Sequence, residues 1–194
     1  MTIYTGYVTI AHDSYAAWKT ATLGNGYDFD STYGLQCYDL VAEFWYNVGF
    51  PAGYPTTGGS VNAKDVWTDR YNNLSYNGTT YFDLVTNLNN VKTGDILVYD
   101  GTTDNPYGHI GFADSDYDGS TEFPILSQNN GGTPYPAGGS TVNVHGYSTS
   151  LFLGAFRYRA WNTTPPTPPT PSGRSGKFPW VLYAKKLRDG RNMI

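Results

Sequence analysis

A single cysteine, Cys37, stands at the start of a segment with helical periodicity, and this segment constrains the fold more than any other part of the 194-residue chain. After the cysteine, apolar residues recur three and four positions apart, which places them on one side of an α-helix: Leu40, Val41, Phe44, Trp45 and Val48. Gly49 and Pro51 follow as residues that end a helix. Cys37 is therefore predicted in the first turn of a buried helix. There the unpaired N–H groups and the positive end of the helix dipole stabilise a thiolate and lower the pKa of the thiol. A lone cysteine can also be a small buried apolar residue, and both interpretations stay open on this segment alone.

Oxygen-bearing groups lie just before and just after this cysteine: Asp28, Asp30, Thr32, the backbone carbonyl of Gly34, and Asp39. Carboxylates at alternate positions of a short loop that leads into a helix are an arrangement by which Ca²⁺ collects its oxygen ligands. A solvated acidic turn that caps the helix explains the same residues equally well.

The string D-x-D-x-x-Y-G-x-Q-C-x-D-L, residues 28–40, resembles the start of a CHAP domain, the cysteine- and histidine-dependent amidohydrolase/peptidase module of phage endolysins and bacterial wall hydrolases. It is similar in particular to the calcium-binding version found in staphylococcal phage endolysins. The resemblance implies that Cys37 is the nucleophile and that Ca²⁺ holds the loop over residues 28–39.

Two later segments, GDILVYD and YGHIGFA, are similar to the strands that carry the histidine in CHAP domains. We expect strands over residues 96–99 and 108–113, with His109 at the start of the second one between two glycines. That position suits a proton-transfer residue. His145 is a rival base, but no glycine-flanked strand start accompanies it. His12 is interpreted as a surface or capping histidine.

A strand over residues 123–127 ends in Gln128, Asn129 and Asn130. In papain-like enzymes a third polar residue accepts a hydrogen bond from the far imidazole nitrogen. The resemblance places Asn129 in this role, ahead of Gln128. Calcium-type endolysins carry a glutamate two residues before the asparagine, where this chain has Ser127.

The remaining pattern predicts an α+β, papain-like (NlpC/P60-like) fold in which N-terminal helices pack on an antiparallel sheet. A first helix over residues 15–23 is capped by Asp13 or Ser14, a short helix follows at 62–67, and further strands lie at 141–145 and 154–159. Three regions are expected: a catalytic domain over residues 1–162, a Pro/Thr-rich linker over 163–176, and a short apolar and basic docking tail over 177–194.

A net charge of −4 argues against nucleic acid as the main partner, and the sequence contains neither a secretory signal nor a membrane span. A wall-directed protein would then be encoded by a phage. It would be released from the host cytoplasm through a holin pore or carried on a virion tail, and the residue 177–194 tail could dock onto phage tail proteins.

We therefore expect a peptidoglycan hydrolase, either an endopeptidase or an N-acetylmuramoyl-L-alanine amidase, with a Cys37–His109–Asn129 mechanism. The backbone N–H of Cys37 and the side chain of Gln36 would bind the oxyanion. Two alternatives are an inactive CHAP-like structural or wall-binding component of a phage tail, and a bacterial secreted wall hydrolase or toxin.

Overall fold

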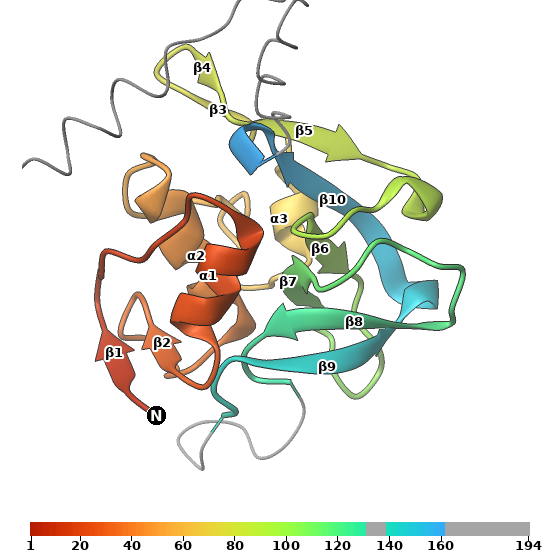
Figure 1. Cartoon of the computed structure of the whole chain (residues 1–194), viewed down its shortest axis with the longest axis horizontal. Coiled ribbons are helices and arrows are strands. Elements are labelled where there is room, and N and C mark those ends of the chain that lie inside the picture. Colours follow the sequence, from red (N-terminus) through yellow and green to blue (C-terminus); the bar gives the residue numbers. More distant parts are fainter. Residues whose placement is uncertain (131–138, 162–194) are drawn as a thin grey trace, which may run out of the picture. The chain divides into compact units, whose positions relative to one another are not determined.

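The computed structural model describes residues 1–130 and 139–161, in which helices pack on one side of an antiparallel sheet (Figure 1). This arrangement confirms the predicted α+β class. The predicted linker and docking tail lie outside the described residues. The helices are α1 (Tyr15–Thr22), α2 (Cys37–Asn47) and α3 (Asp65–Thr68). The strands are β1 (Ile3–Thr5), β2 (Gly26–Asp28), β3 (Ser75–Tyr76), β4 (Thr79–Thr80), β5 (Phe82–Val85), β6 (Ile96–Tyr99), β7 (His109–Ala113), β8 (Glu122–Ser127), β9 (Asn143–Ser148) and β10 (Phe152–Tyr158).

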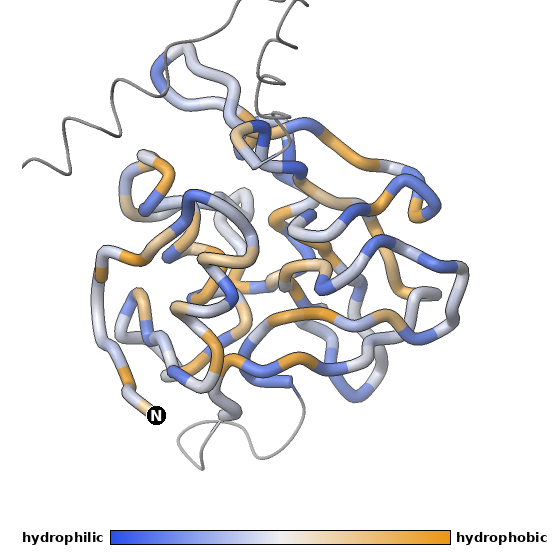
Figure 2. Tube along the Cα trace, viewed as in Figure 1, coloured by the Kyte–Doolittle hydropathy of each residue, from blue (hydrophilic) through white to orange (hydrophobic). Residues whose placement is uncertain are grey.

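The main sheet has the strand order β5-β10-β6-β7-β8-β9, and each neighbouring pair is antiparallel. Alternate residues of β6 belong to two separate apolar clusters, with Ile96 and Val98 on the helix side and Leu97 and Tyr99 on the other. Both sides of the central strands are therefore buried, and Figure 2 shows the strands as largely apolar segments. Burial on both sides explains why β6 is a continuous apolar run.

The predicted strand ranges agree with the observed ones at β6, β7 and β8, while β9 and β10 are shifted. Strand β9 begins at Asn143 and continues three residues beyond the predicted end, to Ser148. The short strands β1 to β4 and strand β5 were not predicted from the sequence. Within the two described ranges, no helix combines the length and the apolar character that a membrane span requires.

Helix α2 lies at the centre of the larger apolar cluster. Phe44 packs edge-on against Trp18 of α1 and Phe112 of β7, with ring centroids 5.1 and 5.3 Å away. Trp45 stacks on Phe82 of β5 at 4.3 Å. An isolated helix of this length would be marginal in water, so packing of its apolar side stabilises it. Ser14 caps α1 by accepting from the Ala17 backbone N–H, which selects one of the two predicted caps.

The buried carboxyl of Glu43 on α2 holds the N-terminal segment against the helix. Its Oε1 atom accepts from the backbone N–H of Val8 at 3.2 Å, and the neighbouring Asn47 binds both Ile10 and Val8. Burial raises the pKa of Glu43 to about 7, although the hydrogen bond from Val8 opposes this shift. The carboxyl is therefore close to half protonated at neutral pH.

We expect Glu43→Gln to remove a pH dependence of stability. Because the folded-state pKa is raised from 4.5 to about 7, the stabilisation by the protonated carboxyl is complete below the unfolded pKa and is lost as pH rises through the folded pKa. Between about pH 4.5 and about pH 8, the free energy of unfolding of the wild type should fall by about 3 kcal/mol relative to the Gln variant. Urea denaturation of both proteins across this range measures the difference, and parallel curves would contradict the assignment.

Candidate active site

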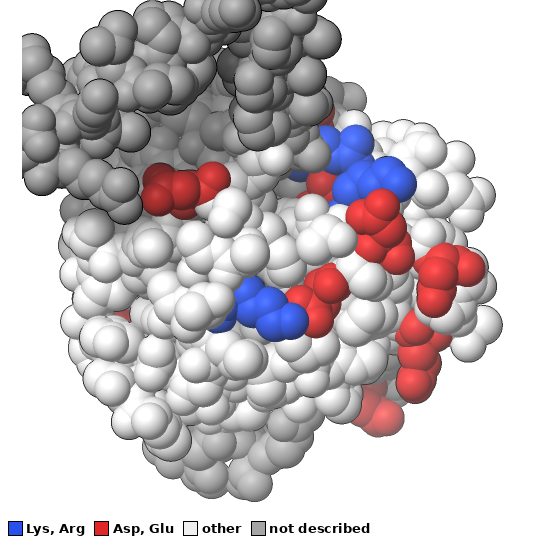
Figure 3. All heavy atoms as spheres, in the orientation of Figure 1, with Lys and Arg blue, Asp and Glu red and all other residues white. Residues whose placement is uncertain are grey.

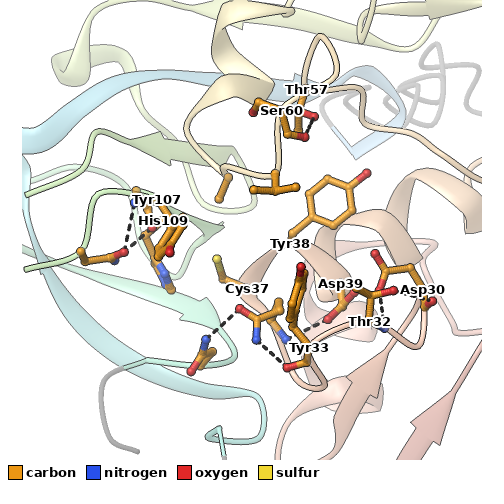
Figure 4. A pocket seen from close by; sticks show the side chains of 16 residues that line it. Asp30, Thr32, Tyr33, Cys37, Tyr38, Asp39, Thr57, Ser60, Tyr107 and His109 are labelled. Carbon is orange, nitrogen blue, oxygen red and sulfur yellow. Dashed lines mark hydrogen bonds between the residues drawn. The ribbon is translucent and has the colours of Figure 1, made fainter. Parts of the chain in front are cut away.

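An open cleft of about 560 Å³ lies between the loop before α2 and the start of β7 (Figure 4). Its walls bring together several of the residues predicted from the sequence. The lining residues include Asp30, Thr32, Gln36, Cys37, Asp39, His109 and Asn129, with Tyr33, Tyr38, Val61, Asn105 and Tyr107 beside them. Figure 4 shows the sulfur of Cys37 and the ring of His109 facing the same space.

Cys37 is the first residue of α2, as predicted, and its thiol is buried. Burial raises the pKa of the thiol to about 11, even though the backbone N–H groups of Ile110, Tyr38 and Cys37 itself favour the thiolate. The predicted lowering of this pKa at a helix N-terminus is therefore wrong for the free protein. Loss of water around the sulfur outweighs the hydrogen bonds, and the thiol is neutral at pH 7.

His109 begins β7 after a glycine that has no room for a side chain. Gly108 has φ +73°, and a Cβ atom there would lie 2.4 Å from the carbonyl oxygen of Tyr99. One side of the buried imidazole stacks on Tyr147 of β9, with centroids 4.8 Å apart and an interplanar angle of 12°. Burial lowers the pKa of His109 to about 4; the hydrogen bond to Asn130 raises it and the charge of His145 lowers it. The imidazole is therefore also neutral at pH 7.

The side chain that meets the far imidazole nitrogen is Asn130, where the sequence predicted Asn129. Nε2 of His109 lies 2.9 Å from Oδ1 of Asn130 and 2.8 Å from Oγ of Ser127. Asn129 has a left-handed backbone with φ +57°, and its amide instead donates to Oε1 of Gln36 at 3.3 Å. The left-handed conformation of Asn129 turns the chain after β8, so that the side chain of Asn130 reaches Nε2 of the imidazole.

The hydrogen bonds of Asn130 define which imidazole nitrogen carries the proton. Its amide nitrogen donates to the carbonyl oxygen of Ser127 at 2.8 Å and to Oδ1 of Asn143 at 3.1 Å. The amide oxygen therefore faces His109, and since a carbonyl oxygen only accepts, Nε2 is the protonated nitrogen. Nδ1 then keeps its lone pair for a proton.

Tyr147 and Asn143 were not singled out in the sequence, although they flank the rival histidine at alternate positions. A strand places residues 143, 145 and 147 on one face. Asn143 lies within the predicted strand 141–145, and extending that strand by two residues would have placed Tyr147 on the same face. His145 is exposed, and His12 is bound to the backbone of Ile10 by its Nδ1 atom at 2.8 Å.

The two glutamines next to the predicted site residues have different surroundings. Gln36 lines the cleft, and its amide nitrogen donates to the carbonyl oxygen of Tyr33 at 2.8 Å. Gln128 is fully buried; its amide oxygen accepts from the N–H of Tyr27 at 3.0 Å, and its amide nitrogen donates to the carbonyl oxygen of Gln36 at 2.7 Å. Gln128 therefore joins the end of β8 to the loop before α2.

The carboxylates of Asp28, Asp30 and Asp39 offer oxygen atoms that all lie within 4.8 Å of one another. Among the described residues, the buried Oδ1 atom of Asp28 has no hydrogen-bond partner. Burial raises the pKa of Asp39 to about 8, opposed by the Gln36 backbone N–H and reinforced by the charges of Asp30 and Asp28. An unpartnered buried oxygen beside two further carboxylates fits a hard cation.

The predicted helix cap is present in the same loop, so the two interpretations of these carboxylates do not exclude each other. Oδ2 of Asp39 accepts from the backbone N–H of Gln36 at 2.8 Å. Oδ1 of Asp30 accepts from the N–H of Thr32 at 2.8 Å, and Gly34 has a left-handed backbone with φ +69°. Oδ2 of Asp39 thus caps α2, and the same carboxylate belongs to the group of three that could hold a metal ion.

Comparison with known proteins identifies the family of this chain. The CHAP domain family matches residues 14–129, so the chain belongs to the CHAP family. A D-alanyl-L-alanine endopeptidase of Streptococcus phage B30 is 35% identical over 119 residues, which cover 61% of this chain and 25% of that protein. Endolysin PlyTW of Staphylococcus phage Twort is 33% identical over 141 residues, covering 70% of this chain and 27% of that protein. The chain thus spans about a quarter of the length of these relatives.

A solved structure shares the fold. The crystal structure of a wild type endolysin LysIME-EF1 superposes with a TM-score of 0.53 at 21% identity, covering 78% of this chain and 65% of that one.

The assigned protonation of His109 can be measured directly. Two-dimensional ¹H–¹⁵N spectra of the imidazoles should show His109 as the neutral Nε2–H tautomer at about pH 6, since burial lowers its pKa to about 4. Comparison with His145→Gln and His12→Gln spectra assigns the resonance. A midpoint near the ordinary value of 6.5, or a proton on Nδ1, would contradict the described geometry.

Proposed function

We propose that this chain is the catalytic domain of a phage peptidoglycan hydrolase, in which Cys37 is the nucleophile and His109 the general base. The observation that carries the proposal is that a thiol at the start of α2 and an imidazole at the start of β7 line one cleft. Membership of the CHAP family and two phage-encoded relatives support it.

The described geometry suggests how the residues would act. Nδ1 of His109 takes the proton of the Cys37 thiol while the sulfur attacks an amide carbonyl carbon. Because thiol and imidazole are both neutral beforehand, proton transfer accompanies the attack. The imidazolium then protonates the leaving amine, and a water molecule, deprotonated by the same nitrogen, hydrolyses the thioester.

The negative oxygen of the tetrahedral intermediate needs donors near the start of α2. We assign the backbone N–H of Cys37 and the amide nitrogen of Gln36 to this role. The Gln36 amide nitrogen has two N–H groups, of which one donates to the carbonyl oxygen of Tyr33. Its second N–H group remains for the substrate.

We further propose that the scissile bond is a peptide bond in the stem peptide or the cross-bridge of peptidoglycan. The first candidate is a D-alanyl-L-alanine bond. The B30 relative carries that bond in its name. Exposed Tyr33 and Tyr107 line the cleft and offer ring surfaces to a sugar–peptide polymer. Hydrolysis of a glycan–peptide amide is the competing assignment.

We assign the protein to a phage lysin, released through a holin pore or carried on a virion, with peptidoglycan as its partner. Docking of the residue 177–194 tail onto phage tail proteins is a separate proposal. An inactive structural component is disfavoured because both Cys37 and His109 are present at the cleft.

Cys37→Ala and His109→Ala should each reduce release of wall fragments by at least about a hundredfold, since a nucleophile and a general base are removed. Mass spectrometry of fragments from purified walls gives both the rate and the bond. Asn89→Ala, at an exposed position outside the cleft, serves as the control. A Cys37→Ala protein that clears walls at the wild-type rate would refute the mechanism. A free muramic acid carboxyl in the products would show that the enzyme is an amidase and not a peptidase.

We also propose that Asp28, Asp30 and Asp39, with Thr32 and the carbonyl oxygen of Gly34, hold Ca²⁺. Bound Ca²⁺ would supply positive charge that neutralises the three carboxylates. Asp39 accepts from the backbone of Gln36, so a rigid carboxylate loop also fixes the start of α2. Mg²⁺ suits the loop poorly because it demands a tighter octahedron.

Chelation should lower both melting temperature and activity, and Ca²⁺ should restore both, with Mg²⁺ much less effective. At a hundredfold excess over its dissociation constant, the ion stabilises the fold by roughly 2.7 kcal/mol. Asp30→Ala should mimic chelation, whereas Asp116→Ala, at an exposed carboxylate paired with Lys92, should not. The Ca²⁺ proposal is wrong if calorimetry detects no heat of Ca²⁺ binding and the melting temperature does not change with chelator. The carboxylates would then serve only to cap α2.

A further inference from the structure

The imidazole of His109 is held by a group of three side chains to which the sequence analysis assigned no role. Ser127 ends β8, Asn130 follows three residues later, and Asn143 begins β9 directly opposite Ser127 in the strand register. The hydroxyl of Ser127 donates to Oδ1 of Asn130, which also lies 2.9 Å from Nε2 of His109. We propose that Asn130, fixed by Asn143 and Ser127, is the positioning residue for His109. This inference deepens the proposed function and rests on it.

The amide of Asn130 has one orientation that satisfies its neighbours. Its nitrogen faces three acceptors, namely the carbonyl oxygens of Ser127 and Asn143 at 2.8 and 3.3 Å and Oδ1 of Asn143 at 3.1 Å. A flipped amide would direct its oxygen at these three acceptors and would remove the N–H donor that each of them has here. Buried polar groups without partners are costly, so the amide oxygen stays directed at Nε2.

The backbone around Asn130 is anchored independently of the imidazole. Its N–H donates to Oγ of Ser140 at 2.8 Å, and the N–H of Asn129 donates to the carbonyl oxygen of Ser140 at 2.9 Å. Asn143 is in turn fixed by a hydrogen bond from its own amide to the carbonyl oxygen of Thr141 at 2.8 Å. The amide oxygen is therefore in place before any substrate arrives, which is the requirement for a positioning residue.

A neutral amide acts on the base differently from a carboxylate. It accepts from Nε2–H and fixes the tautomer, but it stabilises an imidazolium less than a buried negative charge would. The other titratable groups that face or neighbour His109 are the Cys37 thiol of α2, Tyr99 of β6, and His145 and Tyr147 of β9. None of these supplies a negative charge at neutral pH, so the hydrogen bond to the residue at position 130 is what opposes the effect of burial on the imidazole pKa.

Three variants of the full chain test this role: Asn130→Ala, Asn130→Asp and Asn143→Ala. Asn130→Ala should lower kcat by on the order of 10- to 100-fold with little change in KM, because the ring is no longer fixed for attack. Its His109 should show a mixture of neutral tautomers in ¹H–¹⁵N spectra. Asn143→Ala, which loosens the amide without removing it, should give a smaller loss and a partial tautomer mixture.

Asn130→Asp tests the role through the pH dependence of activity, which would not change if Asn130 were only a structural residue. The buried carboxylate should shift the acid limb of the kcat/KM profile and the His109 titration to higher pH by about one to three units. Asn73→Ala is the matched control, since Asn73 is a fully buried asparagine whose amide donates to the carbonyl oxygens of Thr56 and Val66. It should lower the melting temperature and leave tautomer and pH profile unchanged.

The inference is overturned if Asn130→Ala keeps the pure Nε2–H tautomer with wild-type kcat, or if it loses activity while tautomer and pH profile stay unchanged. Should Asn130→Ala fail to fold, Asn130→Asp and Asn143→Ala decide by the same criteria. The tautomer is measured without substrate, so its outcome does not depend on the proposed function. The proposed function is refuted by a different result, namely hydrolysis by the Cys37→Ala variant.

Discussion

The site depends on the side-chain amide of Gln128, which joins three parts of the chain that lie far apart in sequence. The amide binds both the N–H and the carbonyl of Tyr27, and also the carbonyl oxygen of Gln36. Tyr27 directly precedes the carboxylate loop, and Gln36 directly precedes Cys37. Loss of this amide would leave buried backbone groups without partners, at about 1–3 kcal/mol for each group. Cys37, the carboxylate loop and the end of β8 are therefore held together by a fully buried side chain.

Burial then determines the chemistry of the groups in that frame. The thiol and the imidazole both lose water, and both are neutral as a result. The helix N-terminus and the backbone N–H of Ile110 favour a thiolate, but desolvation is the larger effect. Figure 3 shows basic side chains beside acidic ones on the visible surface. Cys37 and His109 therefore form no ion pair in the free protein, and the proposed oxyanion donors would meet a substrate carbonyl without displacing one.

The sequence predicted the features that depend on periodicity and missed those that depend on local backbone geometry. Helix α2, the start of β7 and the cleft pairing of Cys37 with His109 follow from apolar spacing and from motif order. The resemblance to CHAP domains assigned the support of the imidazole to Asn129, ahead of Gln128. The left-handed turn at Asn129 instead brings Asn130 to the imidazole, and an asparagine tolerates this conformation without any other signal in the sequence. The sign of the Cys37 pKa shift was also out of reach, since it depends on how completely the other elements cover the thiol.

The proposed catalytic groups and the side chains that contact them come from ends of regular elements. Cys37 begins α2, His109 begins β7, Ser127 ends β8 and Asn143 begins β9. At such ends the regular backbone hydrogen bonds of the helix or sheet stop, so N–H groups and side chains can point toward a common site. The interiors of the same elements carry the apolar residues that fix their mutual positions, such as Phe44 against Phe112. Precision at the site therefore comes from the rigid core, while the identity of the chemistry comes from a few terminal residues. The left-handed turn at Asn129 is an example, because it lies outside the regular elements of the core and yet decides that Asn130 meets Nε2 of His109.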